Sequence, residues 1–123
     1  MRFTLDSHPS ANLVTHIGPE GLRVGDLRIT RSVILSATEV VRDWPVTDAG
    51  ALSLRSLAPA LELNPEILVL GTGPRGHFPG GELYAELAGR GIGLEVMDTA
   101  SACRTYNILV NEERPVVAAL ILP

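Results

Sequence analysis

Three mainly apolar segments in the second half of the chain constrain its fold more than any other feature. They are separated by segments with helical spacing, and the repeat of strand, helix and strand is typical of βαβ crossovers. Strands that are apolar on both faces belong in a sheet that helices cover on both sides. The apolar segments are ILVLG (67–71), IGLEVMD (92–98) and PVVAALIL (115–122).

Helical patterns lie before and between these apolar segments. Leucines recur at helical spacing in the first pattern, a glycine follows the second, and the third opens with an Asp-Thr pair that is typical of a helix start. The order predicts a mostly parallel C-terminal sheet. The predicted helices are LSLRSLAPALEL (52–63), GELYAELAGRG (81–91) and TASACRTYNILVNEE (99–113).

The first half of the chain has a different residue pattern. Residues 13–46 alternate β-branched and polar side chains, and the turns Gly-Pro-Glu-Gly and Gly-Asp interrupt them. This pattern predicts an antiparallel β-meander of four or five short strands up to about Val46. No linker divides the 123 residues, so we expect an α/β fold in a single domain spanning residues 1–123.

The charge distribution argues against nucleic acid as a partner. The formal net charge is −4, and acidic and basic residues are interspersed along the chain. All ten basic residues are arginine. The absence of lysine removes a common Schiff-base or general-base group, and it suggests the codon bias of a GC-rich bacterial genome.

The sequence predicts a cytoplasmic protein that does not insert into a membrane. The first ten residues have neither the apolar core of a signal peptide nor an amphipathic transit pattern. No apolar run approaches the roughly 18 residues that a membrane-spanning helix needs. The single cysteine, Cys103, cannot form a disulfide within the chain.

A glycine-rich loop after the first apolar strand matches the dinucleotide-binding pattern G-x-G-x-x-G, from Gly71 to Gly76. In a dinucleotide fold, this loop leads within a few residues into a helix whose amides face the pyrophosphate. Here Pro74 and Pro79 remove N–H donors and delay the helix to about Gly80. We therefore interpret the loop as structural and expect no nucleotide cofactor.

Several short motifs in the second half resemble the Mth938-like family, also called domain of unknown function 498. They are Gly71-Thr72-Gly73 after a strand, Gly91-Ile92-Gly93 before one, Met97-Asp98-Thr99, Thr105-Tyr106-Asn107 and the terminal apolar strand. The first half agrees more loosely, through LRVGDLRITRSVILS and Trp44-Pro45. The resemblance covers nearly the whole chain, and its signal is concentrated after Ile67.

This resemblance implies a three-layer α/β sandwich with an added β-meander, as the residue patterns also predict. It implies no reaction, cofactor or catalytic residue. The family includes mitochondrial complex I assembly factor 3, which acts by binding other proteins. A non-catalytic protein-binding or assembly module is therefore the function that the resemblance implies.

Residues with reactive side chains have simpler interpretations than catalysis. Cys103 shares a helix face with the ring of Tyr106, which predicts that both are core residues. Asp98 is expected to cap the helix that begins at Thr99. The three histidines, His8, His16 and His77, lack metal-ligand spacing, so we expect no metal site.

A binding crevice is expected at the carboxyl edge of the sheet, where ligands of open α/β sheets bind. If the strands that end near Leu70 and Met97 are adjacent and parallel, the loops that follow them face each other. Arginine side chains and free amides at a helix start would favour an anion such as a carboxylate. The predicted crevice residues are Gly71, Thr72, Gly73, Arg75, Asp98, Thr99, Arg104 and Asn107.

The sequence thus favours a module that binds a protein partner, with components of a respiratory complex or a membrane assembly as candidate partners. A homo-oligomer is compatible with this interpretation. Two alternatives remain open at this stage. One is a small enzyme that uses Cys103 or Asp98 in the crevice, and the other is a degenerate nucleotide binder.

Overall fold

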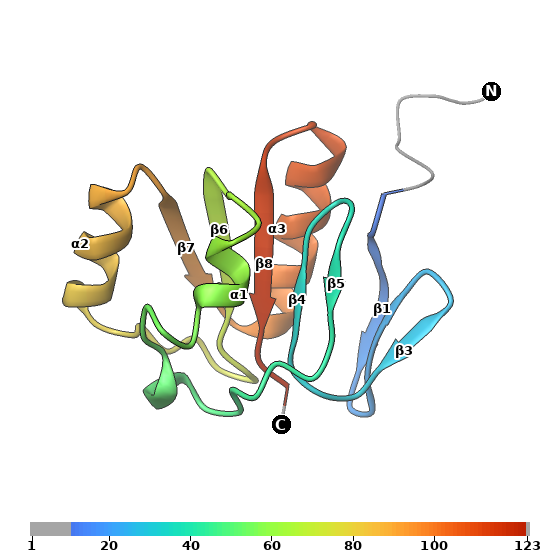
Figure 1. Cartoon of the computed structure of the whole chain (residues 1–123). Helices are drawn as coiled ribbons and strands as arrows, with labels where there is room; N and C mark the ends of the chain where they lie inside the picture. The colour runs from blue at the N-terminus through green and yellow to red at the C-terminus, as the bar shows by residue number, and fades with distance from the viewer. Residues whose placement is uncertain (1–10, 123) are drawn as a thin grey trace.

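The computed structural model describes residues 11–122, which form two sheets and three α-helices (Figure 1). The predicted alternation of strands and helices in the second half is confirmed. In chain order the elements are β1 (Val14–Gly18), β2 (Gly21–Val24), β3 (Leu27–Ile29), β4 (Val33–Leu35), β5 (Val40–Val41), a 3-10 helix η1 (Ala49–Ala51), α1 (Ala58–Leu61), β6 (Ile67–Gly71), α2 (Gly81–Gly89), β7 (Gly93–Met97), α3 (Thr99–Asn111) and β8 (Val116–Leu120).

The larger sheet has five strands in the order β5-β4-β8-β6-β7. β6 pairs in parallel with both β7 and β8, whereas β4 pairs antiparallel with β8 and with β5. β1, β2 and β3 form a separate antiparallel sheet. The meander expected in the first half is therefore present, but its last two strands join the larger sheet.

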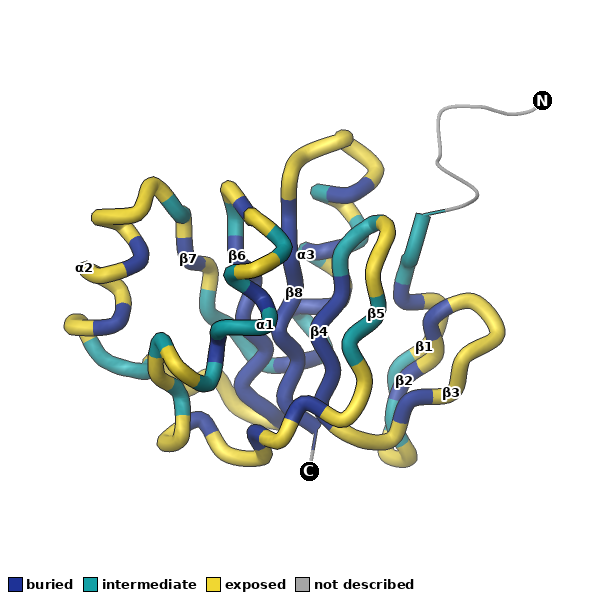
Figure 2. Tube along the Cα trace, viewed as in Figure 1, coloured by how far each residue is buried: buried dark blue, intermediate teal, exposed yellow. Residues whose placement is uncertain are grey.

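Strand β8 shows why the larger sheet must be covered on both faces. Its side chains alternate between two hydrophobic clusters: Val116, Ala118 and Leu120 face one, and Val117 and Ala119 face the other. All five residues are buried, and the β8 tube is dark blue in Figure 2. This alternation follows from the two-residue period of a strand, so the continuous apolar run is explained.

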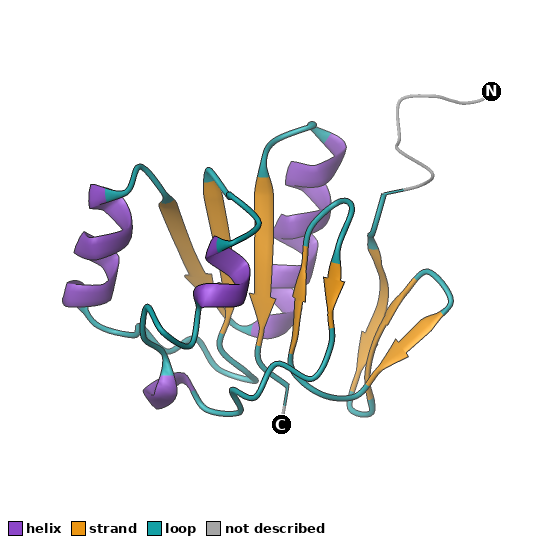
Figure 3. Ribbon diagram, viewed as in Figure 1, coloured by secondary structure: helices purple, strands orange, loops and turns teal. Residues whose placement is uncertain are grey.

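The two clusters define three layers. Cys103 and Tyr106 of α3 pack in the first cluster with residues of β1, β2 and β3, and Figure 3 shows α3 on one side of the larger sheet. Leu57, Leu83 and Leu87, in or beside α1 and α2, pack in the second cluster on the other side. The architecture is the three-layer α/β sandwich with an added β-meander that the sequence predicted.

One predicted helix is much shorter than expected. The spacing of leucines predicted a helix over residues 52–63, but α1 covers only Ala58–Leu61. Pro59 cannot sit in a helix interior, because its ring clashes with the carbonyl four residues earlier. Before α1 the chain instead turns through Ser53 and Ser56, whose hydroxyls each accept a hydrogen bond from the other's amide at 3.1 and 2.9 Å.

Candidate functional site

The carboxyl ends of β6 and β7 lie side by side, as the crevice prediction required. The two strands are parallel neighbours, with Gly71 opposite Met97 at their ends. The loop that leaves β6 and the start of α3 therefore meet at this edge, at the bottom of Figure 1. We call this region the carboxyl edge.

Thr99 joins the loop to α3. Its amide donates to the carbonyl of Gly73 at 2.8 Å, and its hydroxyl accepts from the amide of Gly73 at 2.8 Å. The same hydroxyl donates to the carbonyl of Ile121 at 2.8 Å. Thr99 is buried, so these bonds hold three segments of backbone together away from water.

Glycine is needed at two positions of the loop, for a different structural reason at each. A Cβ atom on Gly71 would lie 2.9 Å from the Cα of Thr99 and 3.1 Å from the Cβ of Ala102. Only glycine lets β6 and α3 approach so closely. Gly73 has a φ of 100°, which disfavours a side chain for a different reason. The glycine-rich pattern is thus explained by packing and backbone conformation.

Thr72 closes the loop on itself. Its amide donates to the carbonyl of Met97 at 3.0 Å, and its hydroxyl accepts from the amide of His77 at 3.0 Å. The hydroxyl also lies 2.8 Å from the carbonyl of Arg75. The amides of Thr72, Gly73 and His77 are therefore engaged within the protein, where a phosphate-binding loop would present such amides to its ligand.

Asp98 caps α3 as the sequence predicted. Its carboxylate accepts hydrogen bonds from the amide of Ser101 at 2.8 Å and from the hydroxyl of Ser101 at 2.9 Å. These bonds, first the one from the amide, lower the pKa of Asp98, and the nearby charge of Arg104 lowers it further. The carboxylate is thus charged at neutral pH.

The start of α3 offers fewer free amides than the anion prediction assumed. The amide of Thr99 bonds to Gly73, and the amide of Ser101 bonds to the carboxylate of Asp98. Arg104 is exposed, and its guanidinium donates to the hydroxyl of Ser101 at 3.1 Å, so it already lies beside the negative charge of Asp98. Arg75 is exposed on the loop.

Asn107 lies away from the carboxyl edge. Its side-chain amide donates to the carbonyl of Val14 at 2.8 Å and accepts from the amide of Val14 at 2.9 Å. A carboxamide carries one donor group and one acceptor, like a peptide bond, so it pairs with the backbone of β1 as a strand would. The structure does not bring Asn107 to the crevice, and it gives this residue a role in docking the smaller sheet.

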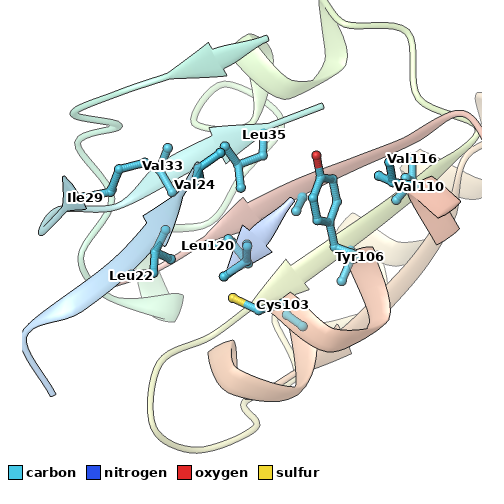
Figure 4. Close-up of a cluster of buried hydrophobic side chains, with 14 of the residues drawn as sticks. Leu22, Val24, Ile29, Val33, Leu35, Cys103, Tyr106, Val110, Val116 and Leu120 are labelled. Carbon is cyan, nitrogen blue, oxygen red and sulfur yellow. The ribbon is translucent and has the colours of Figure 1, made fainter. Parts of the chain in front are cut away.

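Cys103 and Tyr106 lie in the first hydrophobic cluster, as predicted, and Figure 4 shows both pointing from α3 toward the strands. Cys103 is only 2% exposed, and burial raises the pKa of its thiol to about 12. The hydroxyl of Tyr106 donates to the carbonyl of Asn12 at 2.6 Å, and burial raises its pKa as well. A thiol with so high a pKa is a poor nucleophile at neutral pH.

A shallow hollow of about 430 Å³ opens at the carboxyl edge. It brings together three of the predicted crevice residues, Gly73, Asp98 and Thr99. Most of its surface is apolar. Pro74 of the same loop and Ala100 of α3 also line it. The other lining residues come from β1 and its turn into β2, from the residue after β3 and from the segment after β8, which sequence patterns did not connect with the crevice: Ile17, Gly18, Pro19, Glu20, Gly21, Thr30, Ile121 and Leu122.

Two exposed aromatic side chains lie on the loop that leaves β6 and on α2, the helix that follows this loop. Phe78 is 56% exposed and Tyr84, in α2, is 45% exposed. Their ring centroids are 5.9 Å apart, so the rings contact each other. We call these two residues the aromatic pair. No sequence pattern pointed to this pair, although Phe78 and Tyr84 closely follow the glycine-rich loop in the sequence.

The described residues include no cluster that suggests metal binding. Within residues 11–122, no three histidine, cysteine or carboxylate side chains come together as ligands would. His16 and His77 are exposed, and His8 lies outside the described residues. Every helix in the same range is too short or too polar to cross a lipid bilayer.

The layers, the strand order and the carboxyl-edge loop define a Mth938-like α/β domain. A Mth938-like domain from Bordetella pertussis matches with a TM-score of 0.82 and 31% identity over 98% of this chain and 92% of that one. The chain belongs to the family described as protein of unknown function (DUF498/DUF598), whose family model matches residues 14–121.

Two further relatives extend the comparison. A crystal structure of a Bordetella parapertussis protein matches with a TM-score of 0.86 and 37% identity over 93% of this chain and 98% of that one. A zebrafish protein, NADH dehydrogenase [ubiquinone] 1 alpha subcomplex assembly factor 3, is 44% identical over 85 residues. That alignment covers 68% of this chain but only 49% of the zebrafish protein, so this chain corresponds to about half of that relative's length.

Proposed function

We propose that this chain is a non-catalytic protein-binding module of the assembly-factor type and that the carboxyl edge is its contact surface. The aromatic pair is the observation that carries the proposal. Large aromatic side chains that stay exposed are costly in a free protein, and they are enriched among the residues that dominate binding between proteins. The apolar hollow at the carboxyl edge, lined in part by Ile121 and Leu122, is a second apolar surface in the same region.

The names of relatives support the assembly role. Proteins from zebrafish, Xenopus tropicalis and cattle that resemble this chain are each named as assembly factor 3 of the NADH dehydrogenase alpha subcomplex. By analogy, a component of a respiratory complex is the partner we propose. A bacterial, cytoplasmic setting belongs to the same proposal, on the basis of the arginine-only composition and the single cysteine, Cys103, which is free and buried.

The alternative enzyme lacks a supporting observation. Cys103 is buried with a raised pKa, and the two described histidines, His16 and His77, are exposed. The pKa of Asp98 is lowered, and its carboxylate is occupied by Ser101, whereas a general acid or base works best with a pKa near the working pH. We therefore assign both residues structural roles in the proposal.

We propose that an anion binds only at the rim of the carboxyl edge, which we define by Arg75 and Arg104. Arg75 and Arg104 are exposed, and a guanidinium group pairs well with the carboxylate of a partner. Two helix amides that would have helped are engaged by Gly73 and Asp98, so the arginines carry this role without them. In this arrangement, apolar contacts bind the partner and the arginines orient it.

Affinity capture with matched variants tests the proposed function. The wild type should retain one protein in stoichiometric amount from lysate of its native source, and Phe78→Ser with Tyr84→Ser should lose it. Ile108→Ser is the control, because Ile108 is 57% exposed on α3 and belongs to neither the hollow nor the aromatic pair. Equal loss in the control, or no stoichiometric partner with the wild type, would contradict the proposal.

A further inference from the structure

The outer face of the smaller sheet carries a row of basic side chains. Residues alternate along β2, so Leu22 and Val24 are buried while Arg23 is exposed. In β3, Ile29 is buried and Arg28 is exposed. The packing of the apolar residues thus dictates that both arginines face outward.

The register of the smaller sheet aligns these side chains. Arg23 lies directly opposite Arg28 on β3, and it lies directly opposite His16 on β1. We call His16, Arg23 and Arg28 the basic row. The row crosses all three strands, and neighbouring strands are about 4.8 Å apart, so it spans about 10 Å.

A further arginine lies at the end of the row. The guanidinium of Arg42 donates to the carbonyl of Arg28 at 2.9 Å, which brings its positive charge to the edge strand β3. Among residues 11–122, neither Arg23 nor Arg28 forms an ion pair with a carboxylate. Like charges placed directly opposite each other destabilise a sheet, so the row adds no stability to the free protein.

The basic row borders a second hollow, of about 400 Å³. Its lining consists of His16, Glu20, Gly21, Leu22, Arg23 and Arg28. Glu20 is the single acidic residue in this lining, and it lies near His16, since both side chains come within 4 Å of the position that a Cβ on Gly18 would take. The two arginines outnumber this single acidic residue, so the lining carries a net positive charge.

We propose that the basic row binds a short acidic segment of a protein partner. Charge complementarity is the argument. Two guanidinium groups side by side offer parallel N–H donors that match carboxylates, and in an extended segment the side chains at positions i and i+2 lie about 7 Å apart on one face. Both carboxylates of such a segment therefore reach the row at once.

A protein segment fits the row better than a nucleic acid. The chain as a whole has a net charge of −4, so a long polyanion is repelled beyond the patch. The row is also short, about 10 Å, and a short acidic segment matches that length. Glu20 and Gly21 line both hollows, but the arginines of this site lie on the smaller sheet, whereas the loop of the carboxyl edge leaves the larger one. The proposal does not depend on the function proposed for the carboxyl edge.

Fluorescence anisotropy with a labelled peptide of alternating glutamate and threonine tests this site at low ionic strength. Arg23→Gln with Arg28→Gln should weaken binding by about tenfold, because two charge-assisted contacts are removed. Arg55→Gln with Arg90→Gln is the matched control: both are exposed arginines outside the row, and the change in net charge is the same. The control should bind like the wild type.

Three outcomes would overturn the proposal. The first is the absence of saturable binding by the wild type. The second is an equal loss in both double variants, which would mean attraction by net charge alone. The third is tighter binding of a single-stranded oligonucleotide than of the acidic peptide. A neutral peptide of alternating glutamine and threonine should not bind, and circular dichroism should show that both double variants are folded.

Discussion

Thr99 and Gly73 are joined by two hydrogen bonds of 2.8 Å, one in each direction, between the first residue of α3 and the loop that leaves β6. The pair closes the carboxyl edge, because the hydroxyl of Thr99 also bonds to the carbonyl of Ile121. A side chain with an acceptor and a donor at one atom is needed here, and this requirement leads to the first prediction.

Thr99→Val should destabilise the protein without changing its shape. Valine has nearly the same volume, but it leaves the amide of Gly73 and the carbonyl of Ile121 without partners in a buried place, at about 1–3 kcal/mol for each group. Urea denaturation measures the loss. Thr105→Val is the control, since within residues 11–122 the hydroxyl of Thr105 forms one hydrogen bond, a weak one to the sulfur of Met97 at 3.3 Å. Equal losses in the two variants would contradict the role assigned to Thr99.

Gly71→Ala should destabilise the fold by about 1–3 kcal/mol, because the new methyl group overlaps the backbone of Thr99 and pushes α3 away from β6. Gly89→Ala is the opposite case. Gly89 lies at the exposed end of α2 with open space around it, so alanine should stabilise by about 0.5–1 kcal/mol. Thermal denaturation of both variants checks the predicted difference in sign.

The protein should show no measurable affinity for NAD, NADP or FAD. The glycine-rich loop resembles a dinucleotide site in its letters only, since the amides of Thr72, Gly73 and His77 bond within the protein. Isothermal titration calorimetry is the measurement. A dissociation constant in the micromolar range would show that the loop rearranges to bind a pyrophosphate.

Cys103 should make stability fall at high pH. Its folded pKa of about 12 lies above the ordinary value of 9.0, so the buried neutral thiol stabilises the fold fully below pH 9, and this contribution is lost as the pH rises toward 12. Between pH 9 and 10 the free energy of unfolding should fall by about 1 kcal/mol relative to Cys103→Ala. Parallel curves for the two proteins would contradict the assignment. Thiol reagents should also label native Cys103 slowly and unfolded Cys103 quickly.

Arg75→Ala and Arg104→Ala should each change stability by less than about 0.5 kcal/mol, because both side chains are exposed. If the rim of the carboxyl edge accepts an acidic group, each change should weaken capture of the partner by about 1.5–3 kcal/mol. Quantitative capture and melting temperature are measured together. A loss of stability as large as the loss of binding would assign Arg104 to the scaffold, and Arg55→Ala controls for net charge.

Sequence patterns predicted the elements correctly where the buried side chains repeat at the short spacing of a strand or helix. The apolar run at residues 116–120 predicted a strand buried on both faces, and Asp98 followed by Thr99 predicted a capped helix start, and both are confirmed. The leucine spacing over residues 52–63 was misleading. Those leucines pack against the sheet from turns, and Pro59 prevents one continuous helix.

The residues of the site likewise include some that the sequence predicted and some that it did not. The sequence predicted that Gly73, Asp98 and Thr99 converge, because the ends of parallel strands meet at one edge. It did not predict that Ile17 and Ile121 line the same hollow, nor that Asn107 binds Val14. The partners in that hydrogen bond are 93 residues apart, and nothing in the local spacing connects them.

By itself, the sequence determined most of the strands and helices and which of their faces are buried, with the segment 52–63 as the exception. These properties arise from side-chain periodicity and from capping within a few residues, and both are local. Only the tertiary structure decided that β8 lies between β4 and β6, that the smaller sheet packs on α3 and that the basic row is aligned. Such choices depend on hydrogen bonds and packing between distant segments, whose energies no short window of sequence contains.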